Sequence, residues 1–320
     1  MMDALSKLLT TREWILADNA TATSLLGAVE PAPQGGVETL NLGAPEAVLA
    51  HHRASLAAGA DVILTNSFAA NGGRAKISVS GGPDLELYAL NRAAAQIARE
   101  AAEGAEREIV VAGSLGPTGQ IMAPMGSLSH AGAVEIYHAQ AEALKEGGAD
   151  LLWFETLSSA EELRAAAEAA LLTGMEWTVT MSFDTAGQTM MGLTPARLAA
   201  AVEQVTHKPL AFGANCGVSA SDNLRAIAEL GASGSERPLI AKGNAGIAHQ
   251  VGARLEYDGT PGLMADYAAL ARDLGCRIIG GCCGTTPAHL AAMRDALTDR
   301  PRAPRPTLDL IAERLGSFTS

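Results

Sequence analysis

Eight short apolar runs recur along the 320-residue chain, and an alanine-rich stretch with helical spacing follows each run. The runs occupy residues 14–17, 61–64, 109–112, 150–154, 177–181, 209–212, 238–241 and 276–279. Strands that are apolar almost throughout are typical of a parallel sheet covered on both faces. Eight strand–helix units are the number that closes a barrel, so the sequence predicts an α/β protein with a single-domain (β/α)8 TIM-barrel fold.

The helical stretches complete this organisation. They are expected at residues 45–59, 84–103, 129–148, 158–173, 194–206, 219–231, 261–274 and 286–298. Several begin at a serine or threonine suited to an N-cap: Ser129, Ser158, Thr194 and Thr260. A doubly wound sheet is the alternative, but it normally carries an early Gly-x-Gly-x-x-Gly turn, which this chain lacks. We assign residues 1–300 to the barrel and 301–320 to a tail with a short helix, and we expect long loops at 19–43 and 70–83.

Net charge, apolar runs and cysteine content limit the kinds of molecule that this protein is expected to bind. The formal net charge of −12 argues against nucleic acid and against anionic membrane surfaces, both of which attract basic patches. No apolar run approaches the roughly 20 residues of a membrane span, and the N-terminus does not have the pattern of a signal peptide. Four cysteines are too few for a disulfide scaffold in a chain of this length. We therefore expect a cytoplasmic enzyme that acts on small molecules; whether it forms a homo-oligomer is left open.

Three cysteines follow predicted strands and are flanked by glycine. Cys282 and Cys283 follow the eighth run, and Cys216 follows the sixth. Strand ends of this kind meet at one mouth of a barrel, and three thiolates with an open fourth position are a typical catalytic arrangement for Zn²⁺. The alternative is that they are small buried residues in tight turns. Two such sites, one with a cysteine doublet, favour metal binding. Cys276 begins its strand and is expected to be inert packing at the opposite end.

Two carboxylates are expected at the same mouth. Asp18 follows the first run and Glu155 the fourth. Asp18 could instead cap the following loop, whereas Glu155 directly after a buried strand is costly unless it is paired. Zinc held by three thiolates is a poor activator of water but stabilises a substrate thiolate, and the carboxylates can hold an amino group. Thiol alkylation is the favoured chemistry; a zinc hydrolase would require histidine ligands, and the seven histidines show no such spacing.

At this point the motifs match a known family. The segments Gly280–Pro287, Gly213–Gly217 and Leu64–Phe68 make the chain similar to the homocysteine S-methyltransferase family over residues 12–297, and within it to bacterial betaine–homocysteine methyltransferases. The resemblance implies that Cys216, Cys282 and Cys283 are zinc ligands. It also implies that Asp18, Thr65 and Glu155 hold the amino-acid end of homocysteine, and Asn66, beside Thr65, is assigned to the same substrate site. The implied reaction is zinc-dependent methyl transfer from a small onium donor to the thiol of homocysteine, which gives methionine.

One segment departs from the family pattern. The family usually reads Asp-Gly-Ala-Met/Thr-Gly-Thr after the first strand, but here Asn19 and Ala22 replace both glycines. Glycine permits a close backbone approach and unusual φ values, so these replacements leave the thiol acceptor open. The alternatives are a different acceptor, or a zinc- and thiol-binding protein with little activity.

The sequence constrains the identity of the methyl donor least. Betaine is favoured, and a quaternary ammonium is best held by aromatic faces. The chain is only 4% aromatic, with Phe68, Phe154 and Phe183 as candidates at the mouth and Tyr257 in a later loop. S-methylmethionine or another sulfonium is the alternative donor.

Overall fold

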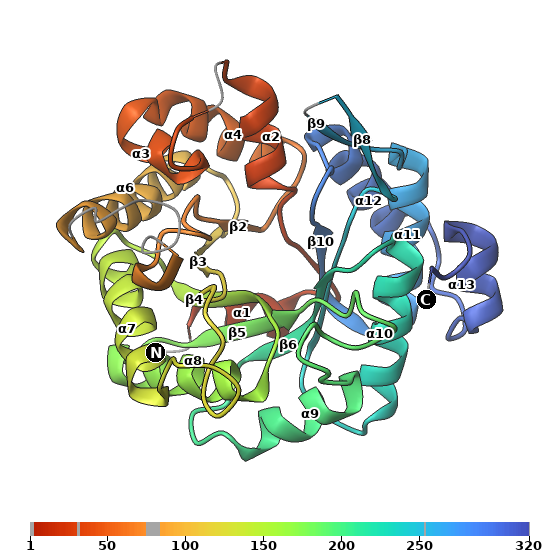
Figure 1. Cartoon of the computed structure of the whole chain (residues 1–320). Coiled ribbons are helices and arrows are strands. Elements are labelled where there is room, and N and C mark those ends of the chain that lie inside the picture. Colours follow the sequence, from red (N-terminus) through yellow and green to blue (C-terminus); the bar gives the residue numbers. More distant parts are fainter. Residues whose placement is uncertain (1–2, 31–32, 75–83, 253, 320) are drawn as a thin grey trace.

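The computed structural model describes residues 3–30, 33–74, 84–252 and 254–319. Eight parallel strands in the order β1-β10-β7-β6-β5-β4-β3-β2 form a nearly closed barrel with helices around it (Figure 1). They are β1 (Ile15–Leu16), β2 (Val62–Leu64), β3 (Val110–Leu115), β4 (Leu151–Leu157), β5 (Trp177–Met181), β6 (Ala211–Cys216), β7 (Leu239–Gly243) and β10 (Cys276–Gly281). An isolated parallel bridge between Ala17 and Val62 joins β1 to β2. The predicted TIM-barrel fold is confirmed.

The eight expected helices are present, and their ends agree with the sequence pattern to within two residues. They are α4 (Pro45–Ala57), α6 (Asp84–Ala102), α7 (His130–Glu146), α8 (Ala160–Thr173), α9 (Pro195–Gln204), α10 (Ala220–Ala232), α11 (Pro261–Asp273) and α12 (Pro287–Asp299). The side chains of Ser129, Thr194 and Thr260 accept N-cap hydrogen bonds as expected. Ser158 does not: the cap of α8 is Ser159, which accepts from Glu162 N at 3.1 Å.

The long loop expected at 19–43 is wrong. This segment contains α2 (Thr21–Ala28), the 3₁₀ turn η1 (Val37–Thr39) and α3 (Leu40–Gly43). Leu25, Val37 and Leu40 from these elements form a small core with Val48 of α4, and this burial stabilises short elements that would be marginal in isolation. Of the loop expected at 70–83, residues 75–83 lie outside the described residues.

Two further elements have no counterpart in the sequence prediction. Helix α1 (Ala4–Thr11) precedes the first strand, and strands β8 (Ala248–Val251) and β9 (Arg254–Tyr257) form an antiparallel hairpin after β7. Leu5 and Leu8 of α1 are buried among the inward-facing side chains of the barrel, so α1 closes one end of it.

Side chains alternate between two cores along each strand. Val62, Val110, Trp153 and Ile240 belong to the cluster inside the barrel, whereas their neighbours in sequence pack outward against the helices. Near the carboxyl ends of the strands, the inward positions become polar. Ser114, Glu155 and Lys242 each lie two residues after a member of the inner cluster on the same strand. This polar layer forms the floor of the site described below.

The tail after α12 lies on the outside of the barrel and carries the expected short helix, α13 (Leu308–Leu315), seen at the right of Figure 1. The Arg305 guanidinium donates to the backbone oxygens of Leu274 and Ala228, at 3.1 Å each, and so fixes the tail to the barrel. Within the described part of the chain, none of the helices combines the length and the apolar character needed to cross a membrane.

Candidate metal centre and substrate site

The three predicted cysteines meet at the carboxyl ends of β6 and β10. The Sγ atoms of Cys216, Cys282 and Cys283 all lie within 4.8 Å of one another. Cys216 Sγ is 2.8 Å from Cys282 Sγ and 4.0 Å from Cys283 Sγ, and none of the three forms a disulfide. Cys276 is fully buried in the outer core at the start of β10 and is not part of this group.

The sulfur geometry fits a tetrahedral thiolate site with a small adjustment. Two thiolates at about 2.3 Å from a tetrahedral Zn²⁺ lie about 3.8 Å apart. The separation between Cys216 and Cys283 is close to this value, whereas Cys282 must move about 1 Å away from Cys216 to reach it. In the metal-free cluster, hydrogen bonds from Cys216 and Cys282 lower the pKa of Cys283. The same contacts, with burial, raise the pKa of Cys216, and the pKa of Cys282 is raised as well, so Cys283 is the first thiol of the group to lose its proton.

Local backbone structure places the sulfurs. Cys216 has a φ of 53°, in the left-handed region that side chains other than glycine rarely adopt. Gly284 has a φ of +76°, and a Cβ there would lie 2.2 Å from Cγ of Tyr257, so only glycine lets that ring pack behind the cysteine doublet. Tyr257 hydrogen bonds to Cys283, and this contact helps to lower the pKa of that cysteine.

A hollow of about 140 Å³ opens beside the sulfurs. It is lined by all the site residues that the sequence predicted, namely Asp18, Thr65, Asn66, Glu155, Cys216, Cys282 and Cys283. It is smaller than the roughly 300–1,000 Å³ of typical ligand pockets, which suits a molecule of amino-acid size. No histidine is among its described lining residues, which removes the ligand type that a zinc hydrolase would need.

Asp18 is paired with a lysine that the sequence analysis missed. Lys242 Nζ donates to Asp18 Oδ1 at 2.8 Å, and Leu64 N donates to Asp18 Oδ2 at 2.8 Å. Both side chains are buried, and the ammonium also lies 5.5 Å from the centre of the Trp153 ring. Burial by itself lowers the pKa of Lys242, but Asp18 and Glu155 outweigh it, so the pKa stays above its usual value. The Asp18–Lys242 pair forms the floor of the hollow.

The missed lysine had a signal in the sequence. Strand side chains alternate, so Lys242 shares the inward face of β7 with Ile240. A lysine at an inward position of a barrel strand requires a buried partner, and strand ends at the same mouth are where that partner is expected.

Glu155 faces the hollow from β4. Ser114 Oγ donates to Glu155 Oε1 at 2.5 Å. Burial raises the pKa of Glu155 to about 7, against the opposing effect of Lys242. A carboxyl group with this pKa is poised to ionise when a cationic group arrives, as the amino group of an amino acid would.

Thr65 and Asn66 line the hollow, but their hydrogen bonds go mainly to other groups of the protein. Thr65 Oγ1 accepts from Ser114 N at 2.9 Å, and Asn66 Nδ2 donates to Val37 O and Asn41 Oδ1 at 2.8 and 3.0 Å. Asn66 therefore fixes η1 and α3 over the hollow. Its assignment to substrate binding, like that of Thr65, stays a prediction.

Of the three candidate phenylalanines, only Phe68 lines the hollow. Phe154 is buried in the outer core with edge-on contacts to Tyr137 and Trp177, and Phe183 is buried in the same core. Expecting them at the mouth was wrong, because the inward positions of β4 belong to Trp153 and Glu155. The Phe68 ring already attracts a cation, the Arg74 guanidinium, at 5.1 Å from its centre.

The substitutions that depart from the family pattern cause no backbone strain. Neither Asn19 nor Ala22 has a positive φ, and Ala22 lies in the first turn of α2. Asn19 is buried and its Oδ1 accepts from Ser55 Oγ of α4 at 2.8 Å. The concern that the missing glycines distort this segment is therefore not supported by the geometry.

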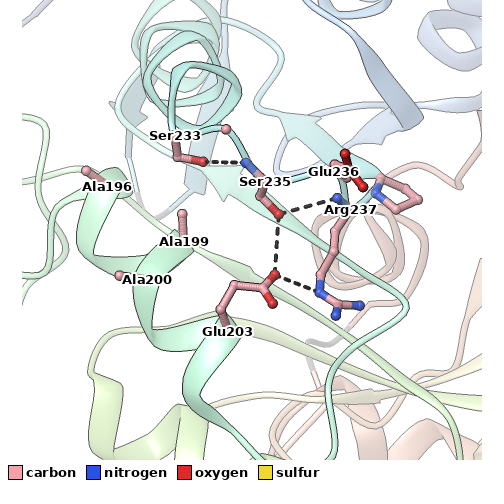
Figure 2. Close-up of a pocket in the computed structure, with 10 residues that line it drawn as sticks. Ala196, Ala199, Ala200, Glu203, Ser233, Ser235, Glu236 and Arg237 are labelled. Atoms are coloured by element: carbon pink, nitrogen blue, oxygen red, sulfur yellow. Dashed lines mark hydrogen bonds and ion pairs between the residues drawn. The ribbon is translucent and has the colours of Figure 1, made fainter.

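A second hollow, of about 630 Å³, lies near the opposite end of β7 (Figure 2). It is bounded by α9 and the segment leading into β7, where Glu203 pairs with Arg237 at 2.9 Å. Its described lining contains alanines, serines and this exposed ion pair, without a cysteine or a histidine. It has none of the groups that a metal-dependent thiol reaction requires.

Comparison with known proteins gives a consistent result. The sequence model of homocysteine S-methyltransferases matches residues 15–297. The homocysteine methyltransferase MmuM from Escherichia coli, in its metallated form, is 25% identical over 91% of this chain and 99% of that chain, with a TM-score of 0.76. Its apo form gives 25% identity, 92% and 100% coverage, and a TM-score of 0.73. A methyltransferase from Methanosarcina mazei, 13% identical over 92% of this chain and 98% of that chain with a TM-score of 0.54, shares the fold. With three sulfurs gathered at the mouth of the matching barrel, this chain belongs to the homocysteine S-methyltransferase family and is an S-methyltransferase.

Proposed function

We propose that this S-methyltransferase moves a methyl group from a small onium donor, with betaine favoured, to the thiol of homocysteine in a zinc-dependent reaction that gives methionine. The observation that carries the proposal is that three cysteine sulfurs and the Asp18–Lys242 ion pair line one hollow of amino-acid size. The sulfurs suit a soft metal, and the charged floor suits a zwitterion.

In this proposal Cys216, Cys282 and Cys283 hold the zinc. Three thiolates leave one tetrahedral position for the substrate sulfur. When bound there, zinc would supply the positive charge that keeps a thiol deprotonated at neutral pH. The metallated form of the E. coli relative supports a metal in this family, and the choice of zinc rests on the all-sulfur donor set of this chain.

Charged residues would orient the acceptor. Glu155, with its raised pKa, would ionise fully on pairing with the amino group of homocysteine. Asp18 contributes the second carboxylate, while Lys242 balances its charge and lies within reach of a substrate carboxylate. Holding both ends of the amino acid would fix the reach of its thiol towards the cysteines. Thr65 and Asn66 would shape the wall on the β2 side.

The donor would enter over Phe68 and the start of α2, which line the outer part of the hollow. An onium methyl group lying in line with the acceptor sulfur is attacked by the sulfur lone pair. The S–CH₃ bond forms as the N–CH₃ bond of betaine breaks, and the neutral amine leaves with the electron pair. Phe68 is the one aromatic residue among the described lining residues, and a sulfonium such as S-methylmethionine is the second candidate donor.

The test is a donor screen with zinc-loaded protein. Homocysteine is supplied with betaine or S-methylmethionine carrying a deuterated methyl group, and labelled methionine is followed by mass spectrometry. We expect label transfer from betaine and release of about one proton when homocysteine binds. Transfer from S-methylmethionine alone would correct the donor.

A parallel binding measurement separates the alternatives. Proton release without product from any donor would identify a zinc- and thiol-binding protein with little activity. Failure of the purified protein to retain zinc with near-equal stoichiometry would refute the metal assignment. Transfer to another thiol in preference to homocysteine would correct the acceptor.

A further inference from the structure

Asn215 connects the two halves of the site. It is fully buried on β6, directly before Cys216. Its Oδ1 accepts from the backbone N of Thr156 at 2.9 Å, and its Nδ2 donates to Thr156 Oγ1 at 2.8 Å and to Cys216 Sγ at 3.3 Å. A longer contact of 3.9 Å joins Nδ2 to Cys282 Sγ, so one amide binds both the residue after Glu155 and the cysteines of the metal centre.

The contact to β4 replaces a missing ladder bond. β4 pairs with β5, but the register shifts between Phe154 and Leu157, so that Glu155 and Thr156 form a bulge. Bulges of this kind re-aim a side chain, here Thr156, which lines the hollow beside the inward-facing Glu155. The bulge leaves Thr156 N without a partner on β5, and Asn215 supplies one from the next strand along the sheet.

The backbone on both sides of this amide is strained. Thr156 has a φ of 62° and Cys216 a φ of 53°, two of the three positive values among the described residues that are not glycine. A β-branched residue such as threonine rarely adopts this conformation, which persists only where neighbouring contacts hold it. The amide orientation is itself fixed, because a backbone N–H can only donate and so must face Oδ1.

We propose that Asn215 is a positioning residue that couples the acceptor site to the metal centre. The inference rests on the proposed function for the identity of the two ligands. Asn215 holds Thr156 in its strained conformation and thereby fixes the backbone next to Glu155, and the same side chain holds the Cys216 sulfur towards Cys282 and Cys283. Loss of this one side chain weakens zinc and homocysteine binding together, although it touches neither ligand.

The test uses Asn215→Leu, which keeps the approximate volume and removes all the hydrogen bonds of this side chain. Zinc affinity is measured by chelator competition, and homocysteine affinity by calorimetry on zinc-loaded protein without a methyl donor. We expect zinc affinity to fall roughly 10- to 100-fold, the usual effect of losing a residue that orients a metal ligand, and homocysteine affinity to fall about tenfold or more. Adding Thr156→Gly, which adopts a positive φ freely, restores homocysteine affinity but not zinc affinity.

Thr156→Val in the wild-type background is the matched control. It removes only the bond to Oγ1, so homocysteine affinity should fall a few-fold while zinc affinity is unchanged, and this prediction stands even where Asn215→Leu does not fold. Unchanged affinities for both ligands in Asn215→Leu, or a rescue by Thr156→Gly that restores both equally, would overturn the coupling. Failure of the wild-type protein to bind homocysteine or to form methionine would instead count against the proposed function.

Discussion

Replacing Lys242 with methionine tests the charged floor of the site. Lys242 Nζ and Asp18 Oδ1 are 2.8 Å apart, and the side chains are only 4% and 1% exposed. At an effective dielectric constant of 20, this separation corresponds to an attraction of roughly 6 kcal/mol. Desolvation of two ions offsets part of it, and removing one partner of a buried pair typically costs about 3–5 kcal/mol. Methionine keeps the contact with Trp153, so the lost charge dominates the change.

We expect K242M to lose about 3–5 kcal/mol in the free energy of unfolding, measured by urea denaturation with circular dichroism. The midpoint temperature should fall by roughly 4–7 °C in a chain of this size. The double variant K242M/D18N leaves no unpaired buried charge, and it should recover at least about 2 kcal/mol relative to the sum of the single variants. A K242M protein within about 1 kcal/mol of the wild type, or strictly additive losses, would show that the pair does not stabilise the floor.

Three further variants of site residues, one with a matched control outside the site, test separate parts of it. In the metal-free protein the raised pKa of Glu155, about 7 against the usual 4.5, means that the folded state keeps a proton which the unfolded chain releases. Stability should therefore decline between about pH 4.5 and 7, by on the order of 3 kcal/mol, and E155Q should abolish this decline in pH-dependent denaturation curves. C216S should lower the bound zinc, measured by atomic absorption, whereas the matched variant C276A should retain it and lose only about 1–2 kcal/mol from a small cavity. F68L should raise the KM for betaine several-fold more than that for homocysteine in steady-state assays, and equal changes in both would contradict its place on the donor side.

Periodicity carried most of the fold prediction. Apolar runs such as 177–181 indicate strands because both faces of a parallel sheet are buried. The helical stretches between the runs favour a parallel sheet over other arrangements. The barrel then determined the candidate site. Once eight strands point the same way, residues after different strands converge, which is how Cys216 and Cys282, 66 residues apart, could be placed together from sequence.

The parts that were missed depend on contacts between distant segments. Helix α2 and the turn η1 lie in a stretch whose structure depends on burial against α4, and no local pattern reports that burial. The outward position of Phe154 follows from the strand alternation that also predicts an inward Lys242. Counting every second residue along each strand, instead of treating all residues at a strand end alike, would have predicted the outward Phe154 and the inward Lys242.

The segment after the first strand shows why a motif departure need not change a site. Glycine is required where φ is positive or where a Cβ has no room. Neither Asn19 nor Ala22 has a positive φ, and Asn19 adds a buried hydrogen bond to Ser55. The strained positions of this site lie elsewhere, at Thr156 and Cys216, where a side-chain amide holds conformations that glycine would adopt without help. Specificity in this chain is therefore expected to depend on the bulge of β4 and its amide clamp as well as on Asn19 and Ala22, since the bulge and these two residues line the same hollow.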